Sequence, residues 1–282
     1  MLSLDRLLSE SERLDPVPQI IHQLMDLVND PEAPMSEITE LILYEPVVTA
    51  NLLKLANSAA FGLKTKVNSV HDAVVFLGLK RVVDLVLLNS VSSSLIMAYQ
   101  GYGLEEGRLW KQSVSCALIA SAIAESIDAP TKHSVFTAAL LKDIAVIVMD
   151  RHMSKAVDSI RQAITDNHLD LVSAERKILG IDHAYLGGQM ANKWNFSQSL
   201  VSTITDHHLV DPPKSIEPMT GMVYLADCMC SMSGINADLF SGHYTHYDTV
   251  CDHLGLTEAD ANQIMSDFYA QKENIYGLLA IL

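Results

Sequence analysis

The spacing of apolar residues is the feature of this sequence that most constrains its fold. Apolar side chains recur at intervals of three and four along the chain, which is the period of an α-helix with one buried face. Runs that alternate apolar and polar residues between hairpin turns are missing, so no β-sheet is expected. The sequence therefore predicts an all-α, multi-helical fold.

Capping residues and chain breaks agree with this prediction. Ser69 is followed three residues later by Asp72, as in a capping box, and Ser36 after Pro34 and Ser197 stand at other expected helix starts. Breaks rich in glycine, proline and polar residues fall at 29–34, 59–68, 98–107, 126–133, 211–218 and 241–248. The break at 98–107 is the expected internal boundary, which gives an N-terminal helical part (1–100) and a C-terminal helical part (101–282).

Composition and charge exclude several classes of protein. A hydrophobic content of 49% predicts a globular chain, and no run of 18 or more uncharged apolar residues predicts a membrane span. The formal net charge of −15 repels phosphate backbones and anionic lipid, so neither nucleic acid nor a membrane surface is an expected partner. The N-terminus lacks a basic segment that leads into an apolar core, and we therefore expect a cytoplasmic location.

Two charged residues interrupt an apolar run at 137–150, which reads TAALLKDIAVIVMD. If this run is a helix, neither Lys142 nor Asp143 has a polar neighbour three or four positions away. Buried charge is tolerated only when it is paired, hydrogen-bonded or bound to a metal. The partners of Lys142 and Asp143 must therefore come from elsewhere in the chain.

The first third of the chain carries a recognisable signature. Residues 45–62 read EPVVTANLLKLANSAAFG, residues 68–82 read NSVHDAVVFLGLKRV, and both are preceded by DPVPQIIHQLMDLV at 15–28. This stretch resembles the N-terminal signature of the HDOD family, the HD-related output domain of bacterial signalling proteins, and implies one continuous HDOD unit at about 14–215. Within its most specific part, LANSAAFG, Asn57 and Ser58 are either functional or cap a local chain reversal.

HDOD proteins resemble the HD phosphohydrolase superfamily, which includes the HD-GYP cyclic-dinucleotide phosphodiesterases. There, ligands in the order His, His-Asp, His, His-His and Asp come from successive helices and hold divalent ions that activate water. The resemblance places the corresponding site of this chain at Gln112, Lys142, Asp143, His183, His207, His208 and Asp227. Gln112 stands where the first histidine is expected, and Lys142 replaces the histidine of the His-Asp pair.

The lysine at position 142 changes what this site can do. A lysine is normally protonated and can lie between carboxylates where a metal cation would otherwise sit. We therefore expect Lys142 to pair with Asp143, with Asp227 or with both. Because Gln112 cannot supply an imidazole either, a dinuclear metal centre is not expected.

Three functions remain open at this point. The leading hypothesis is a non-catalytic signal-transduction module that binds a protein partner, with a small-molecule ligand in the remnant site as an addition and with no cofactor. The alternative is a metal-dependent phosphohydrolase with one divalent ion held by Asp143, His183, His207, His208 and Asp227, in which catalysis depends on Asp143. A third is a structural adaptor with a vestigial site, in which His183 merely begins a helix and His207 and His208 end one.

Overall fold

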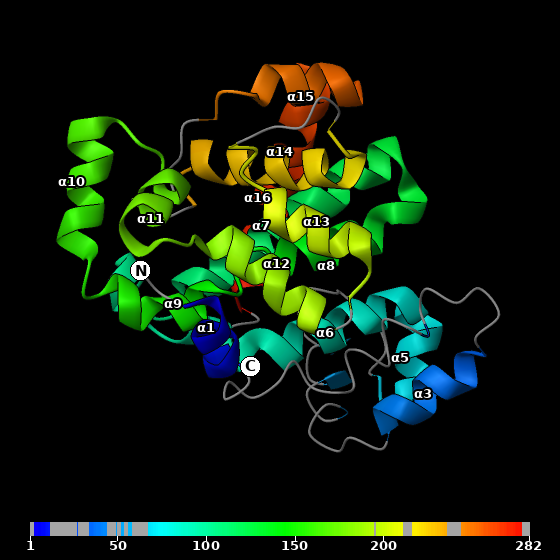
Figure 1. Cartoon of the computed structure of the whole chain (residues 1–282). Coiled ribbons are helices and arrows are strands. Elements are labelled where there is room, and N and C mark those ends of the chain that lie inside the picture. Colours follow the sequence, from blue (N-terminus) through cyan, green and yellow to red (C-terminus); the bar gives the residue numbers. More distant parts are fainter. Residues whose placement is uncertain are drawn as a thin grey trace. The chain divides into compact units, whose positions relative to one another are not determined.

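The fold of the described chain is entirely helical. The computed structural model describes residues 3–11, 27, 34–43, 49, 52, 53, 56, 57, 67–194, 196–210, 216–235 and 244–277. Within these ranges there are fourteen α-helices and two short 3-10 helices, and the only β-type pairing is an isolated bridge between Tyr99 and Leu104 (Figure 1). The all-α prediction is confirmed.

The chain divides into two compact units. One unit contains Met1–Leu14 and Leu95–Ser266, and the other contains Asp15–Ser94 and Asp267–Leu282. The larger unit holds α1 (Leu4–Ser11), η2 (Gln100–Tyr102), α7 (Arg108–Ile127), η3 (Ala129–Thr131), α8 (Lys132–Leu141), α9 (Val146–Met153), α10 (Val157–Asn167), α11 (Leu171–Leu179), α12 (His183–Lys193), α13 (Gln198–Asp206), α14 (Pro218–Met232) and α15 (Tyr247–Leu254). The smaller unit holds α3 (Met35–Leu43) and α5 (Val70–Leu77), while α6 (Leu79–Ile96) and α16 (Glu258–Gly277) run across the divisions. The predicted boundary near residue 100 stays a prediction.

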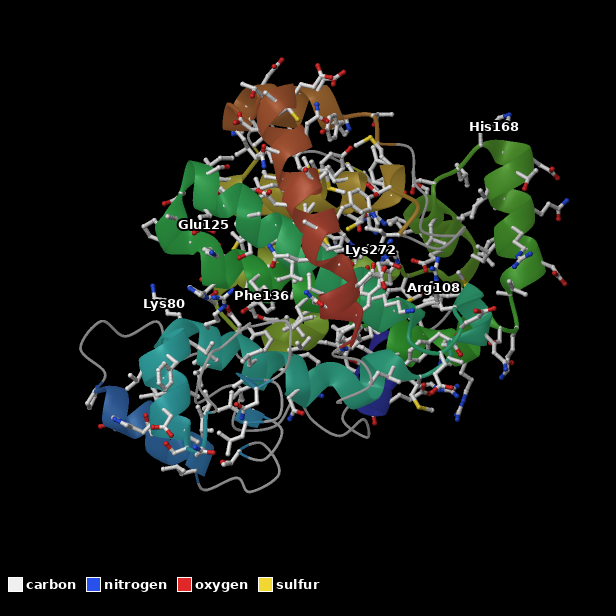
Figure 2. All side chains as sticks on the ribbon, turned by 180° about the vertical axis from the view of Figure 1, so that it is seen from behind. Lys80, Arg108, Glu125, Phe136, His168 and Lys272 are labelled. Carbon is white, nitrogen blue, oxygen red and sulfur yellow. The ribbon has the colours of Figure 1, made fainter. Side chains whose placement is uncertain are left out.

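The core of the larger unit is built around α7 and α8. Helix α7 packs against both α8 and α14, and α12 packs against α13 (Figure 1). Every residue of α8 from Val135 to Leu141 is buried, which is the expected pattern for a helix that is apolar on all sides. Trp110 on α7 is fully buried and its indole Nε1 forms no hydrogen bond. Glu125 lies near the end of α7 (Figure 2). Its carboxylate pairs with Lys132 Nζ at 2.5 Å.

The charged run at 137–150 is not one helix. Helix α8 ends at Leu141 and α9 begins at Val146, and the residues between them form tight turns in which Val146 N donates to Asp143 O at 3.0 Å. A regular helix would direct adjacent side chains about 100° apart. Within this turn Lys142 Nζ lies 2.5 Å from Asp143 Oδ2, although the two residues are adjacent in sequence.

The capping predictions are mostly confirmed. The Ser69 side chain caps α5 by accepting from Asp72 N at 3.0 Å, and Gly78 ends that helix at a φ of +84°, where a side chain would be strained. Ser197 caps α13 by accepting from Leu200 N. The prediction for Ser36 is wrong, because α3 begins at Met35 and Ser36 lies in its first turn.

Asn57 has a local structural role within the smaller unit. Its side-chain amide donates to Leu53 O at 2.8 Å and to Val67 O at 2.7 Å, and its oxygen accepts from Val67 N at 2.8 Å. These bonds tie Asn57 to the backbone at Leu53 and Val67, which is the kind of local role that the capping alternative expects. Ser58 lies outside the described residues.

Two further features of the chain bear on its class. Among the described residues, none of the helices combines the length and the apolar character that a membrane crossing needs. All four cysteines are free thiols, and three of them are buried.

Candidate functional site

One buried polar centre in the larger unit contains every predicted site residue. The centre is assembled from helix α7, from the turn after α8, from the first residue of α12, from the end of α13 and from α14. These elements contribute, in chain order, Gln112, Lys142, Asp143, His183, His207, His208 and Asp227. Asp143 lies at the middle, because its two carboxylate oxygens face two different groups of partners.

Helix ends deliver the histidines to this centre. Asp182 caps α12 by accepting from Tyr185 N at 2.8 Å, so that His183 is the first residue of the helix. His207 follows the last residue of α13, and the chain then turns through Leu209 at a φ of +49°. His183 therefore begins a helix and His207 follows the end of one, as the sequence allows. These two positions bring the imidazoles close to Asp143.

The first group of partners forms a closed lysine half. Lys142 Nζ lies 2.5 Å from Asp143 Oδ2 and 2.8 Å from Asp227 Oδ1, and none of these side chains is more than 2% exposed. Gln112 Nε2 donates to the same Asp143 oxygen at 3.3 Å, and the Tyr244 hydroxyl donates to Asp227 Oδ2 at 3.4 Å. The predicted pairing of Lys142 with both carboxylates is confirmed.

Lys142 and Asp143 each favour their charged form. Burial opposes the charge of Lys142, but the Asp143 and Asp227 carboxylates outweigh it and raise the lysine pKa well above its usual value. Burial likewise opposes ionisation of Asp143, but Lys142 and the neighbouring imidazoles hold the pKa of this carboxyl well below its usual value. The ammonium is therefore a permanent cation between two carboxylates.

The second group of partners forms an open imidazole half. Asp143 Oδ1 lies 3.4 Å from His207 Nε2 and 3.7 Å from His183 Nε2, and His183 Nε2 lies 2.9 Å from His208 Nε2. These four atoms all lie within 4.8 Å of one another. Asp143 Oδ1 and His207 Nε2 are buried and form no hydrogen bond. Because buried polar atoms nearly always have partners, this half has bonding capacity that the protein itself does not use.

The outer nitrogens of two imidazoles are held by acceptors. His207 Nδ1 donates to Ile204 O at 2.8 Å, and His183 Nδ1 contacts Glu175 Oε2 at 2.7 Å. A carbonyl or carboxylate at Nδ1 fixes the proton there and directs Nε2 toward the centre, which is the usual arrangement of metal-binding histidines. Three imidazoles and one carboxylate suit zinc or a first-row transition metal better than magnesium or calcium.

Protonation of the three imidazoles is uneven. Burial opposes the protonation of His183, but Glu175 and Asp143 outweigh it and raise the pKa of His183 to about 9. Burial and the neighbouring cations hold the pKa of His208 well below its usual value. A protonated His183 therefore donates its Nε2 hydrogen to neutral His208.

The residues of this centre fit one metal ion and do not fit two. Asp143, His183, His207 and His208 can supply one ligand atom each to a shared ion. Asp227, which the sequence places in the same ligand set, instead binds Lys142. The ammonium takes both Asp143 Oδ2 and Asp227 Oδ1, so within the described part of the chain these two oxygens serve the lysine and not a second ion.

Two buried residues of the centre's surroundings were not predicted. Glu175 is 0% exposed on α11 and binds His183, and Tyr102 donates to Glu175 Oε1 at 2.6 Å. A sequence signal for Glu175 exists, because it lies four residues after Leu171 and four before Leu179 on the buried face of α11. A carboxylate at a core position of an amphipathic helix requires a buried partner.

The fold and the centre together define an all-helical domain with a buried polar site. The HDOD domain model matches residues 14–210. The chain belongs to the HDOD family, as its N-terminal signature predicts.

Known relatives are distant in sequence and similar in fold. An uncharacterized protein from Treponema pallidum (strain Nichols) is 24% identical over 224 residues, which is 78% of this chain and 43% of the relative, so the chain spans less than half of that protein. An HDOD domain protein of unknown function from Geobacter sulfurreducens has a TM-score of 0.76 at 22% identity, with 98% of each chain covered. A candidate phosphohydrolase from Shewanella amazonensis SB2B has a TM-score of 0.72 at 24% identity, with 97% of each chain covered. These structures establish the likeness of fold.

Proposed function

We propose that this chain is a non-catalytic HDOD signalling module that acts by binding a protein partner. The observation that carries the proposal is the Lys142 ammonium, which lies between Asp143 and Asp227 inside the protein. Hydrolysis of a phosphoester by two metal ions requires both ions to share carboxylate ligands and to hold the attacking and leaving oxygens. An ammonium supplies positive charge but cannot coordinate a water molecule.

The charge of the chain narrows the kind of partner. With 34 acidic and 19 basic residues, the protein repels nucleic acid and anionic lipid. We therefore propose a protein partner in a signalling pathway, and a small molecule bound at the open imidazole half is a compatible addition. The proposal requires no cofactor, since Lys142 already supplies a positive charge to both carboxylates of the lysine half.

Hydrolysis assays test the absence of catalysis. Bis-p-nitrophenyl phosphate and cyclic dinucleotides would be incubated with the protein and added manganese, nickel or iron. We expect the same rate with wild type, with His207→Leu and with Lys132→Met, a surface variant that controls for contaminating activity. Turnover by wild type and by Lys132→Met that disappears in His207→Leu would contradict the proposal.

A second function is favoured by one specific observation. The buried atoms Asp143 Oδ1 and His207 Nε2 have no hydrogen-bond partner and lie beside two further imidazole nitrogens. This observation supports a phosphohydrolase with a single divalent ion held by Asp143, His183, His207 and His208. When bound, such an ion supplies a polarised phosphoryl oxygen and an activated water. In that case Lys142 would keep Asp143 ionised and its Oδ1 directed at the ion.

Elemental analysis separates the two functions. Protein purified without added metal would be measured for zinc, iron, manganese and nickel, beside His207→Leu purified in the same way. A stoichiometric ion in wild type alone, together with turnover, supports the phosphohydrolase. Absence of a stoichiometric ion, together with absence of turnover after metal addition, supports the non-catalytic module.

A further inference from the structure

Glu175 makes an unusual set of contacts for a residue outside the predicted site. Its Oε2 accepts from the backbone N of His183 at 2.9 Å and lies 2.7 Å from Nδ1 of the same residue. Its Oε1 accepts from the Tyr102 hydroxyl at 2.6 Å. Both oxygens of a fully buried carboxylate are therefore occupied, and one of them holds a single histidine at two points.

Ordinary helix capping does not account for these contacts. Asp182 already caps α12 and also accepts from Arg176 Nε at 2.6 Å, so the start of the helix is fixed without Glu175. The bond from Glu175 to the imidazole adds something different, because it holds a proton at Nδ1 and turns Nε2 toward Asp143.

Tyr102 is in turn fixed by a close backbone contact. Gly101 N donates to Asp150 Oδ1 at 2.8 Å, and a Cβ at Gly101 would lie 2.3 Å from Asp150 O. Glycine at this position lets η2 approach α9 closely enough to place the Tyr102 hydroxyl against Glu175. A contiguous set of buried contacts therefore leads from α9 to His183.

We propose that Glu175 is the positioning residue of this centre, and that Tyr102 assists it. Glu175 holds the Nδ1 proton of His183 and so directs Nε2 toward the point that Asp143, His207 and His208 share. A carboxylate behind a ligating histidine fixes the ring and strengthens its binding to a metal. Glu175 therefore sets the affinity of the open imidazole half for a divalent ion. This inference rests on the single-ion site described under the second function.

Metal titration tests the proposal directly. Cobalt(II) would be titrated into wild type, Glu175→Gln, Tyr102→Phe and Glu125→Gln, with visible absorption as the readout of coordination. We expect Glu175→Gln to weaken cobalt binding by about 10- to 100-fold, and Tyr102→Phe to weaken it less. Glu125→Gln removes a surface carboxylate of α7 and should bind cobalt as wild type does. Cobalt affinity of folded Glu175→Gln within twofold of wild type overturns the proposal.

A second readout works in the metal-free protein. The Nδ1 proton of His183, hydrogen-bonded to a carboxylate, should give a low-field signal in the ¹H NMR spectrum that correlates with an imidazole nitrogen. We expect this signal to move upfield in Glu175→Gln and, by a smaller amount, in Tyr102→Phe. An unchanged signal in either folded variant overturns the positioning role. Tyr102→Phe keeps the test decisive if Glu175→Gln does not fold.

The two readouts separate the inference from the function on which it rests. Wild type that binds no cobalt contradicts the single-ion site, and with it the role of Glu175 in metal affinity. In that case the NMR signal still shows whether Glu175 orients His183. Cobalt binding that is unaffected in Glu175→Gln contradicts the inference and leaves the single-ion site intact.

Discussion

The two oxygens of Asp143 face two halves of one centre that are satisfied in opposite ways. Oδ2 lies against Lys142 and Gln112, in a half where the ammonium balances the carboxylates. Oδ1 lies against His207 and His183, in a half where two buried atoms have no hydrogen-bond partner. Lys142 therefore supplies positive charge on one side of Asp143 and leaves the ligand atoms on the other side unfilled.

The difference shows that charge and coordination are separable requirements. The lysine half needs positive charge to keep two buried carboxylates ionised, and an ammonium meets that need. The imidazole half presents lone pairs on ring nitrogens and on Asp143 Oδ1, and a metal ion could accept them. An ammonium held by two carboxylates could not. One half is thus a structural ion pair, while the other keeps the donor atoms of a binding site.

Removal of the ammonium should have the largest effect. Lys142→Met leaves Asp143 and Asp227 as buried carboxylates without their cation, and we expect a loss of about 3–5 kcal/mol in the free energy of unfolding. Urea denaturation measures this loss in the free energy of unfolding. Lys132→Met is the matched control, because Lys132 pairs with Glu125 at the surface and such pairs contribute about 0–1 kcal/mol. Equal stability of the two variants would show that Lys142 does not stabilise the buried carboxylates of Asp143 and Asp227.

Filling the open half should have the next largest effect. Zinc at about 100 times its dissociation constant should raise the free energy of unfolding of wild type by about 2.7 kcal/mol, because the ion binds only the folded state. A chelator should reverse the gain. Thermal unfolding with and without zinc measures it, and the shift should be absent in His207→Leu. A shift that persists in that variant would place the ion elsewhere.

Loss of a histidine from the open half should cost little in metal-free protein. His207 Nε2 has no hydrogen-bond partner, so His207→Leu removes a buried polar atom that is already unsatisfied. We expect the free energy of unfolding in the presence of a chelator to change by no more than about 1 kcal/mol. A loss as large as that of Lys142→Met would erase the distinction between the two halves.

An ion pair outside both halves should give the smallest effect. His152 Nε2 lies 3.0 Å from Glu10 Oε2, which joins α9 to α1, and the hydrogen bond from His152 lowers the pKa of Glu10. A lowered carboxyl pKa stabilises the fold above the unfolded pKa of about 4.3 and loses this effect as pH falls through the folded value. Glu10→Gln should therefore flatten the stability profile slightly below pH 5. Identical profiles for variant and wild type would show that the pair contributes nothing.

Much of the centre follows from simple requirements on buried groups. The apolar period predicts the helices, and the isolation of Lys142 and Asp143 in an apolar run predicts that distant side chains must pair with them. The family resemblance supplies the remaining positions, and the structure brings them together around Asp143. The expectation that Lys142 pairs with Asp143, with Asp227 or with both depended on the family's order of ligands, and the structure shows both pairs.

Two parts of the centre could not be predicted from the sequence in this way. The turn between α8 and α9 contains neither glycine nor proline at residues 142–145, so nothing local in the sequence marks the end of a helix there. Glu175 is followed directly by two charged residues, in AERKIL, and is easily taken for part of a solvated face. Only its spacing from the buried leucines of α11 separates it from Arg176 and Lys177.

The burial of Trp110 gives the protein its own optical probe. The chain has only two tryptophans, and Trp110 lies two residues before Gln112 on α7, fully buried and without a hydrogen bond at its indole nitrogen. An indole in such an apolar setting should emit at short wavelength, and the emission should shift to the red when water reaches it. Intrinsic fluorescence can therefore report the entry of water into the core around α7 in the unlabelled protein.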